Sequence, residues 1–339
     1  MTSHTAAIVG IGPHSPSRGG GTAVAYAHAW ALRKAGIPIV AAAARSQANR
    51  DGFASEFPDT RLFADYRAML AATRPTLVSI CAFPQDREAM ALAALEHGAR
   101  LLWIEKPVAT EAAAARRIAT AAARAGARVV VNFQRRYGAP FAWFRETVTG
   151  GRIGALQGID VVQPGDTLMN FGPHLIDAAL SALGGRKPVA SLGAVDRSSG
   201  LTYQGNPTED HHWSVTHFAD GVRLTITSGN LTNRSPILRA HGDDGFAELH
   251  CGVPAGAASV FRWQGRGSAG VENPPCDEHF HHGTSDGNLY YDRLLVDVLA
   301  CEHAGRSCIV DLEHGIRGLE IIEMAERSAH EGRLVRWPD

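Results

Sequence analysis

The chain has 339 residues, of which 45% are hydrophobic and 20% are charged, so it can bury a large core, and its length predicts two domains. Its 33 basic and 34 acidic side chains leave a formal net charge of −1 at pH 7, which gives no electrostatic basis for binding nucleic acid or an anionic membrane. The five cysteines form no Cys-x-x-Cys pair, which argues against a disulfide framework and a structural zinc site. The chain shows no signal-peptide pattern and no apolar stretch of roughly 20 residues, so we expect a soluble cytoplasmic protein with a small-molecule partner.

The first part of the chain alternates short apolar runs with amphipathic, alanine-rich stretches, which is typical of βαβ units on a parallel sheet. The predicted strands are Ala6–Gly10, Pro38–Ala44, Leu77–Ile80, Leu101–Ile104 and Val129–Val131. The predicted helices are Thr22–Ala35, Asp86–His97 and Thr110–Ala125, each followed by a glycine suited to a left-handed helix end: Gly36, Gly98 and Gly126. We therefore predict an α/β domain with a doubly wound parallel sheet over residues 1–132.

The second part of the chain, after Gly151, has longer runs with period-two character, which predict a largely antiparallel open sheet. The predicted strands are Leu156–Val162, Trp213–Phe218, Val222–Ser228 and Ala247–Cys251, with a further strand, Val260–Trp263, inside the loop-like stretch Gly252–Gly287. The predicted helices are His174–Leu183, Leu289–Ala304 and Leu312–His330. These elements predict an α+β domain over residues 133–339.

A glycine pair, Gly10-Ile11-Gly12, follows the first predicted strand. Glycines at a strand-to-helix turn let the backbone approach a pyrophosphate, and the helix N-terminus supplies amide donors. The third glycine of the usual G-x-G-x-x-G pattern is replaced by Ser15, and three glycines follow later at Gly19–Gly21, so we predict an enlarged phosphate-binding loop. The alternative is a plain tight turn.

The end of the second predicted strand carries Arg45 and Ser46, and no acidic residue follows before Asp51. An acid here would bind the adenosine ribose hydroxyls, whereas an arginine can hold a 2′-phosphate. This pattern favours NADP over NAD. The alternative is that Arg45 is a solvated surface charge.

The tripeptide Glu105-Lys106-Pro107 follows an apolar strand, and ligands of open α/β sheets bind outside the carboxyl ends of the strands. Lys106 is one of only three lysines, with Lys34 and Lys187, so lysine chemistry has few candidates. We predict that Lys106 faces the ligand and transfers a proton. The alternative is a solvated charge at a strand end.

Histidines form two further candidate groups. His174 and Asp177 stand three residues apart at the start of a predicted helix, so the acid could orient the imidazole, although a capping or packing role is the alternative. The group His279–His282, with His211-His212 upstream, has no cysteine or acidic partner at ligand spacing. We therefore predict no metal site.

Four segments together occur in the order and spacing of one family: Gly10-Ile11-Gly12, Glu105-Lys106-Pro107, Asn132–Tyr137 and Gly172–Asp177. Over nearly its whole length the chain resembles the Gfo/Idh/MocA oxidoreductases. The resemblance implies an N-terminal Rossmann domain, and a C-terminal domain whose open sheet makes oligomer contacts on one face, in a homodimer or homotetramer. It also implies a nicotinamide cofactor, NADP or NAD, and hydride transfer at a secondary carbinol of a sugar, glycoside or cyclitol.

The resemblance also implies roles for individual residues. The catalytic residues would be Lys106, His174 and Asn170. The dinucleotide would contact Gly10, Ile11, Gly12, Arg45, Ser46, Cys81, Glu105 and Lys106. The substrate would contact Arg135, Arg136, Asp177 and His211. Lys106 and His174 would share the substrate hydroxyl, and one would take its proton while hydride leaves the carbon.

The main departure from the family pattern is Asn170, because many members have an aspartate four residues before the histidine. An amide can hydrogen-bond a hydroxyl but cannot act as a carboxylate base, which leaves substrate class and direction open. The mixed polar residues near His174 favour a neutral polyhydroxylated ring. The adjacent Arg135 and Arg136 favour the runner-up, a reductase of an acidic sugar or keto compound, and a non-catalytic dinucleotide or sugar sensor is the alternative from another class.

Overall fold

The computed structural model describes residues 4–15, 20–21, 24–229, 235–251, 259–273 and 289–338. The chain divides into two compact units. The first contains the described residues up to Gln134 and resumes over residues 289–316, and the second contains those of 135–273 and 317–338. The boundary predicted after residue 132 lies close to the first of these breaks, but the return of residues 289–316 to the first unit has no counterpart in the local sequence pattern.

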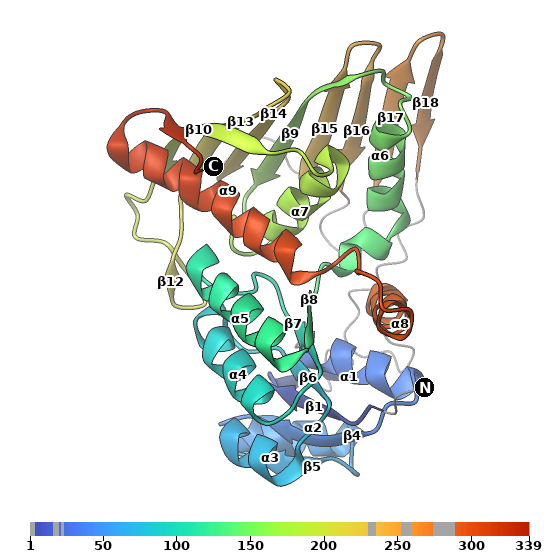
Figure 1. The fold of residues 1–339 in the computed structure, drawn as a ribbon, viewed down its shortest axis with the longest axis vertical. Helices are drawn as coiled ribbons and strands as arrows, with labels where there is room; N and C mark the ends of the chain where they lie inside the picture. Colours follow the sequence, from blue (N-terminus) through green and yellow to red (C-terminus); the bar gives the residue numbers. More distant parts are fainter. Residues whose placement is uncertain are drawn as a thin grey trace. The chain divides into compact units, whose positions relative to one another are not determined.

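The first unit is built on a six-stranded sheet in the order β5-β4-β1-β6-β7-β8, in which every neighbouring pair is parallel (Figure 1). The order reverses between β1 and β6, because the chain moves outward from β1 to β5 and then returns to β1's other side. The predicted doubly wound sheet is therefore confirmed. The strands are β1 (Ala6–Val9), β4 (Ile39–Ala43), β5 (Arg61–Phe63), β6 (Leu77–Ile80), β7 (Leu101–Ile104) and β8 (Arg128–Val131).

The helices of this sheet are α1 (Val24–Lys34), α2 (Gln47–Glu56), α3 (Tyr66–Thr73), α4 (Pro84–Glu96) and α5 (Ala112–Ala125). Gly36, Gly98 and Gly126 have the expected positive φ values of 70°, 90° and 62°. Helices α2 and α3 and the edge strand β5 are not among the elements predicted from the sequence. Helix α2 buries only Phe53 and α3 only Met69 and Leu70, so neither carries the apolar stripe that marks a helix in a sequence.

Helix α8 (Leu289–His303) belongs to the first unit because it packs against α1. Lys34 of α1 donates to Asp292 over 2.8 Å, and His4 pairs with Glu302 at 2.6 Å. The following helix, α9 (Leu312–Glu331), begins in the first unit and continues in the second. No helix within the described ranges combines the length and hydropathy needed to cross a membrane.

The second unit contains a nine-stranded sheet within the described residues, in the order β18-β17-β16-β15-β9-β14-β13-β10-β19. Every neighbouring pair is antiparallel except β9 and β14, which confirms the expected largely antiparallel open sheet. The strands are β9 (Leu156–Pro164), β10 (Pro188–Asp196), β13 (His211–Phe218), β14 (Arg223–Gly229), β15 (Ile237–Gly242), β16 (Phe246–His250), β17 (Val260–Gly265), β18 (Ser268–Glu272) and β19 (Val335–Arg336).

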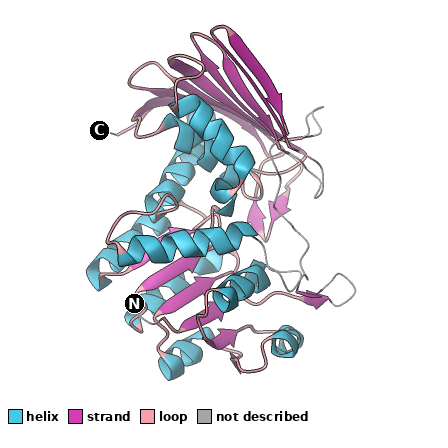
Figure 2. Cartoon of the chain, turned by 90° about the vertical axis from the view of Figure 1, so that its right-hand side faces the viewer, coloured by secondary structure: helices cyan, strands magenta, loops and turns pink. Residues whose placement is uncertain are grey.

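Helices cover only one face of this sheet (Figure 2). The helices α6 (Ala139–Thr149) and α7 (Gly172–Leu183) bury an apolar core against the inward side chains of β9, β14 and β15. The second-unit part of α9 approaches β10 closely at Gly193, where any side chain would overlap the backbone of Ala325. The opposite face is free of helices within this unit and carries exposed apolar side chains such as Leu192 and Trp213.

Candidate active site

The carboxyl ends of β1 and β6 flank the point where the strand order reverses, which is where ligands bind in open α/β sheets. Gly10 lies here with φ of 93°, and a side chain on it would overlap the backbone of Ala82. The amides of Gly10 and Ile11 both donate to the carbonyl of Ala43, over 3.0 and 3.4 Å. The first glycine is therefore required by the packing of three chain segments, whatever binds above them.

Strand β1 ends at Val9 and α1 begins at Val24, and the described residues between them are 10–15 and 20–21. They include two short paired strands, β2 (His14–Ser15) and β3 (Gly20–Gly21). His14 donates from Nε2 to Glu56 of α2 over 2.7 Å, which ties the loop to that helix. Residues 16–19, which include Gly19, lie outside the described residues.

The segment after β4 positions Arg45 and Ser46. Arg45 is exposed, whereas the Ser46 hydroxyl accepts from the amide of Asn49 and caps α2. Two residues that the sequence analysis missed hold this segment in place. Asn49 donates to the carbonyl of Ile11 over 3.0 Å, and Arg50 donates to the carbonyls of residues 44 and 45 over 2.6 and 2.9 Å. The hydroxyl three residues before Asn49 is a helix-start pattern that could have indicated α2.

The carboxyl end of β7 carries a buried acid and a half-buried lysine, Glu105 and Lys106. Glu105 Oε2 accepts from the backbone amide of Lys106 over 3.1 Å. Arg87 of α4 is buried and donates to the carbonyl of Ala82 over 2.8 Å and to that of Pro107. The backbone on both sides of Lys106 is thereby fixed by side chains, so the lysine projects from a rigid edge.

In the second unit, Asn170 lies just before α7 and makes two directed hydrogen bonds. Its amide nitrogen donates to Asp166 over 2.8 Å, and its amide oxygen accepts from the Tyr203 hydroxyl over 2.8 Å. An ionised carboxylate can only accept hydrogen bonds, so Asp166 fixes which end of the Asn170 amide carries the NH2 group. A carboxylate thus lies directly beside Asn170, although residue 170 itself is an amide.

Asp177 of α7 is buried and forms an ion pair with the buried Arg136, whose Nε and Nη2 donate to its two oxygens over 2.6 and 2.7 Å. The spacing predicts that Asp177 orients the His174 imidazole, and this stays a prediction; the contacts described for the Asp177 carboxylate are those to the guanidinium. Burial raises the pKa of the Asp177 carboxyl, and the charge and hydrogen bonds of Arg136 oppose that rise. This bidentate pairing gives Arg136 and Asp177 a structural role.

His174 is buried near the N-terminus of α7, with its ring 6.0 Å from that of Phe171. Arg135 is also buried, and its guanidinium lies 4.3 Å from the centre of the same Phe171 ring. His211 is exposed on the face of β13 that also carries Trp213, whereas α7 packs on the opposite face of the sheet. Asn170 and His174 therefore lie together at the start of α7, whereas His211 lies on the other face of the sheet.

No group of three or more histidine, cysteine or acidic side chains within the described ranges could hold a metal ion. His212 is buried and bonds Ser214 over 2.8 Å, and burial lowers its pKa to about 4. The segment His279–His282 lies outside the described residues. The absence of a catalytic metal stays a prediction.

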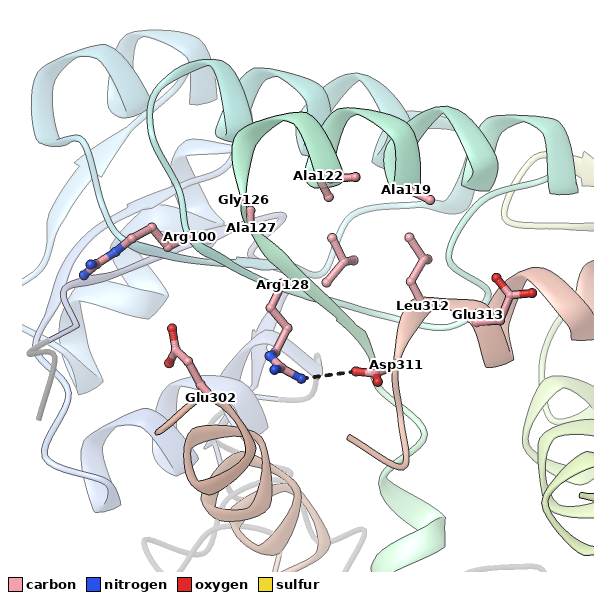
Figure 3. A pocket seen from close by; sticks show the side chains of 12 residues that line it. Arg100, Ala119, Ala122, Gly126, Ala127, Arg128, Glu302, Asp311, Leu312 and Glu313 are labelled. Atoms are coloured by element: carbon pink, nitrogen blue, oxygen red, sulfur yellow. Dashed lines mark ion pairs between the residues drawn. The ribbon is translucent and has the colours of Figure 1, made fainter. Parts of the chain in front are cut away.

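A pocket of about 510 Å³ in the first unit lies at the opposite edge of the sheet, near the amino ends of β7 and β8 (Figure 3). Alanines of α5 line one side, and the charged side chains of Arg100, Arg128, Glu302, Asp311 and Glu313 line the rest. Arg128 lies 3.5 Å from Asp311, so its charge is already compensated. This pocket is separate from the edge that carries Lys106.

Two family models match the chain. One, described as an oxidoreductase family with an NAD-binding Rossmann fold, matches residues 6–133. The other, described as the C-terminal alpha/beta domain of an oxidoreductase family, matches residues 160–337. Together they cover most of both units.

Curated relatives match over shorter segments. D-glucoside 3-dehydrogenase of Escherichia coli (strain K12) is 28% identical over 166 residues, 44% of this chain and 47% of that protein. Inositol 2-dehydrogenase of Burkholderia multivorans is 33% identical over 110 residues, 32% of each chain. The matches thus span about half or less of the length of these relatives.

A solved oxidoreductase from Agrobacterium radiobacter, in complex with NAD+, L-tartaric acid and magnesium, has a similar structure with a TM-score of 0.79. The two chains are 16% identical, and the similarity covers 99% of this chain and 98% of that one. At this identity the comparison establishes a shared fold.

Proposed function

The chain belongs to the Gfo/Idh/MocA family of oxidoreductases, and we propose that it transfers a hydride between a nicotinamide dinucleotide and a secondary carbinol or ketone carbon of a sugar, glycoside or cyclitol. The observation that carries this proposal is the placement of Lys106. It follows β7, at the same carboxyl edge as the reversal point between β1 and β6, and its backbone is fixed on both sides. A dinucleotide at this edge would accept or supply the hydride.

The residues of the first unit fit a dinucleotide. The turn at Gly10 packs closely against the backbone of Ala82. Arg45, which follows β4, is exposed and could contact either a phosphate or solvent. We propose that Gly10, Ile11, Gly12, Ser46, Cys81 and Glu105 line or support the same site. Lys106 would take the proton of the substrate hydroxyl during oxidation and return it during reduction, together with His174.

In the second unit, Asn170 would position the substrate. Its amide is oriented by Asp166 and Tyr203, and an amide combines a donor and an acceptor, which suits a hydroxyl-rich ligand. An acidic substrate is less well supported, because Arg136 is neutralised by Asp177 and Arg135 lies against Phe171. Of the two arginines, Arg135 is therefore the one that supports the runner-up, a carboxylated sugar or keto acid.

The proposed function is tested by reduction of NAD+ and NADP+ with a panel of inositols, methyl glucosides, free sugars and uronic acids, and by oxidation of NADH and NADPH with 2-keto acids. We expect turnover with neutral rings, and activity that persists after treatment with a chelator. Turnover confined to uronic or keto acids would instead support the runner-up. Dinucleotide binding without turnover of any of these compounds would support the sensor alternative.

Cofactor choice gives a first mutational prediction. We expect the wild type to bind NADP(H) more tightly than NAD(H), because the exposed Arg45 can pair with a 2′-phosphate. Arg45→Asp should reverse the ratio of the two dissociation constants, measured by titration calorimetry. Arg67→Asp is the matched control, since Arg67 is an exposed arginine in the first turn of α3, where an acid suits the helix dipole. Tight NAD binding and negligible NADP binding by the wild type would reject this cofactor assignment.

Oligomer formation gives a second prediction. We propose that the helix-free face of the second sheet makes the contacts of a homodimer or homotetramer, because Leu192 and Trp213 are exposed there by 39% and 43%. Light scattering after gel filtration should show an oligomer for the wild type and a smaller species for Trp213→Glu. An exposed position in the first unit, Arg67→Glu, should leave the mass unchanged. A monomeric wild type would contradict this prediction.

A further inference from the structure

A polar cluster lies buried beneath the carboxyl ends of β6 and β7, centred on His28 of α1. The His28 side chain is fully buried, and both ring nitrogens have partners. Nε2 lies 3.2 Å from Glu105 Oε1, and Nδ1 lies 2.7 Å from the Ser79 hydroxyl. The ring also packs 3.8 Å from the centre of the Trp103 ring. The proposed reaction assigns no role to this histidine.

The contacts of both His28 ring nitrogens accommodate an imidazolium. Nε2 must carry a proton to bond the Glu105 carboxylate. The Ser79 hydroxyl lies 3.4 Å from Cys81 Sγ, so it can donate to the sulfur and accept from a protonated Nδ1. Burial lowers the pKa of His28, but Cys81 and Glu105 outweigh this and raise it to about 9.

Glu105 is the matching anion, because its described partners all donate. Oε1 accepts from Asn132 over 2.6 Å and from the Tyr291 hydroxyl of α8 over 3.4 Å, in addition to His28. The Asn132 amide is oriented by the Trp103 indole, which donates to its oxygen over 3.1 Å. Burial raises the pKa of Glu105, but the hydrogen bond and charge of His28, together with the charges of Lys106 and Arg87, give a net lowering.

The second oxygen of Glu105 connects this cluster to the candidate catalytic residue. Oε2 accepts from the backbone amide of Lys106, so the orientation of the Glu105 side chain is coupled to the backbone at the lysine. Asn132 and Tyr291 also donate to Glu105, and the charges of Lys106 and Arg87 also lower its pKa, so the ionised carboxylate does not depend on His28 alone. The net charge beside Lys106 therefore depends on whether His28 is positive.

We propose that His28 is a positioning residue for Lys106: it holds the Glu105 carboxylate in place, Glu105 contacts the backbone of Lys106, and the opposite charges of the His28–Glu105 pair together set the electrostatic field at the ammonium group. The expected effect on turnover rests on the proposed function, whereas the expected effect on the titration of Lys106 involves residues of the first unit alone. Besides Glu105 and His28, the titratable or charged groups of this unit near the strand end are Arg87 of α4, Cys81 after β6 and Tyr291 of α8.

The test measures the titration of Lys106 directly. Reductive methylation with 13C-formaldehyde labels the three lysines and the amino terminus, and Lys106→Met assigns the Lys106 signal in the NMR spectrum. His28→Gln keeps a donor toward Glu105 but removes the positive charge, so the more negative field should raise the Lys106 midpoint by about one pH unit. Glu105→Gln removes the negative charge and should lower the midpoint.

His4→Gln is the matched control. His4 is also buried and also paired with a glutamate, Glu302 at 2.6 Å, but it precedes β1 at the amino edge of the same sheet. The Lys106 midpoint should match that of the wild type in this variant, and Lys187, in the second unit, should titrate identically in all proteins. If Lys106 titrates identically in the wild type and in folded His28→Gln, the proposal is overturned. If His28→Gln does not fold, a lowered Lys106 midpoint in Glu105→Gln supports the proposal, and an unchanged or raised midpoint overturns it.

A kinetic arm separates this inference from the proposed function. In the oxidative direction, where Lys106 must be neutral, the rising limb of kcat against pH should move to higher pH in His28→Gln, with KM for the dinucleotide changed less than twofold. A purely structural role would lower kcat at all pH values without moving the limb, and that outcome would contradict the proposal. The NMR titration of Lys106 needs no substrate, so it tests the role of His28 even if no substrate is found and the proposed function is wrong.

Discussion

Replacement of Lys106 by methionine is expected to reduce turnover by about 10²-fold or more while folding and dinucleotide affinity stay near those of the wild type. Methionine preserves the length and apolar stem of the side chain but cannot exchange a proton. The backbone contacts around residue 106 come from Glu105 and Arg87 and do not need the ammonium group. Steady-state kinetics and calorimetric binding of the dinucleotide measure the two effects separately.

Lys187→Met is the matched control for this change, because Lys187 is an exposed lysine of the second unit. It should leave kcat unchanged. His174→Ala should lower kcat to a similar extent as Lys106→Met if the two residues share the substrate hydroxyl. Near-normal turnover of Lys106→Met would show that the proton moves through another group and would reject the assigned role of Lys106.

Removal of Arg136 should produce the largest loss of stability. Arg136→Met leaves the Asp177 carboxylate buried without its counter-ion, and breaking a buried pair in this way costs about 3–5 kcal/mol. Urea denaturation followed by tryptophan fluorescence should show an earlier transition for the second unit. The double variant Arg136→Met with Asp177→Leu should recover much of the loss, because neither charge then remains buried.

An exposed pair in the same unit provides the control. Arg186 donates to Asp220 over 2.7 Å, and the two side chains are 32% and 48% exposed. Arg186→Met should cost about 1 kcal/mol or less. If Arg136→Met and Arg186→Met destabilise the protein equally, the buried pair does not have the structural role assigned to it here, and a direct role of Arg136 in ligand binding becomes the better explanation.

The predictions that the structure confirmed rest on local patterns. Four-residue apolar runs such as Leu77–Ile80 and Leu101–Ile104 are strands with those same bounds, because strands of a parallel sheet are buried on both faces and read as continuous apolar segments. The helix His174–Leu183 was found because its apolar residues are dense, and in the structure it begins two residues earlier, at Gly172. Segments with few buried residues, such as α2 and α3, gave no comparable pattern.

The family, the doubly wound sheet and the position of Lys106 after a strand follow from the amino-acid sequence, because each depends on local motifs and patterns. The partners of the polar residues depend on the three-dimensional packing. Arg136 and Asp177 are 41 positions apart, and Tyr291 meets Glu105 across 186 positions because α8 returns to pack against α1. His28 meets Glu105 across 77 positions, since α1, β6 and β7 converge at one edge of a parallel sheet. Local periodicity encodes which face of an element is buried, but a pairing between distant elements is set by packing, which no single segment specifies.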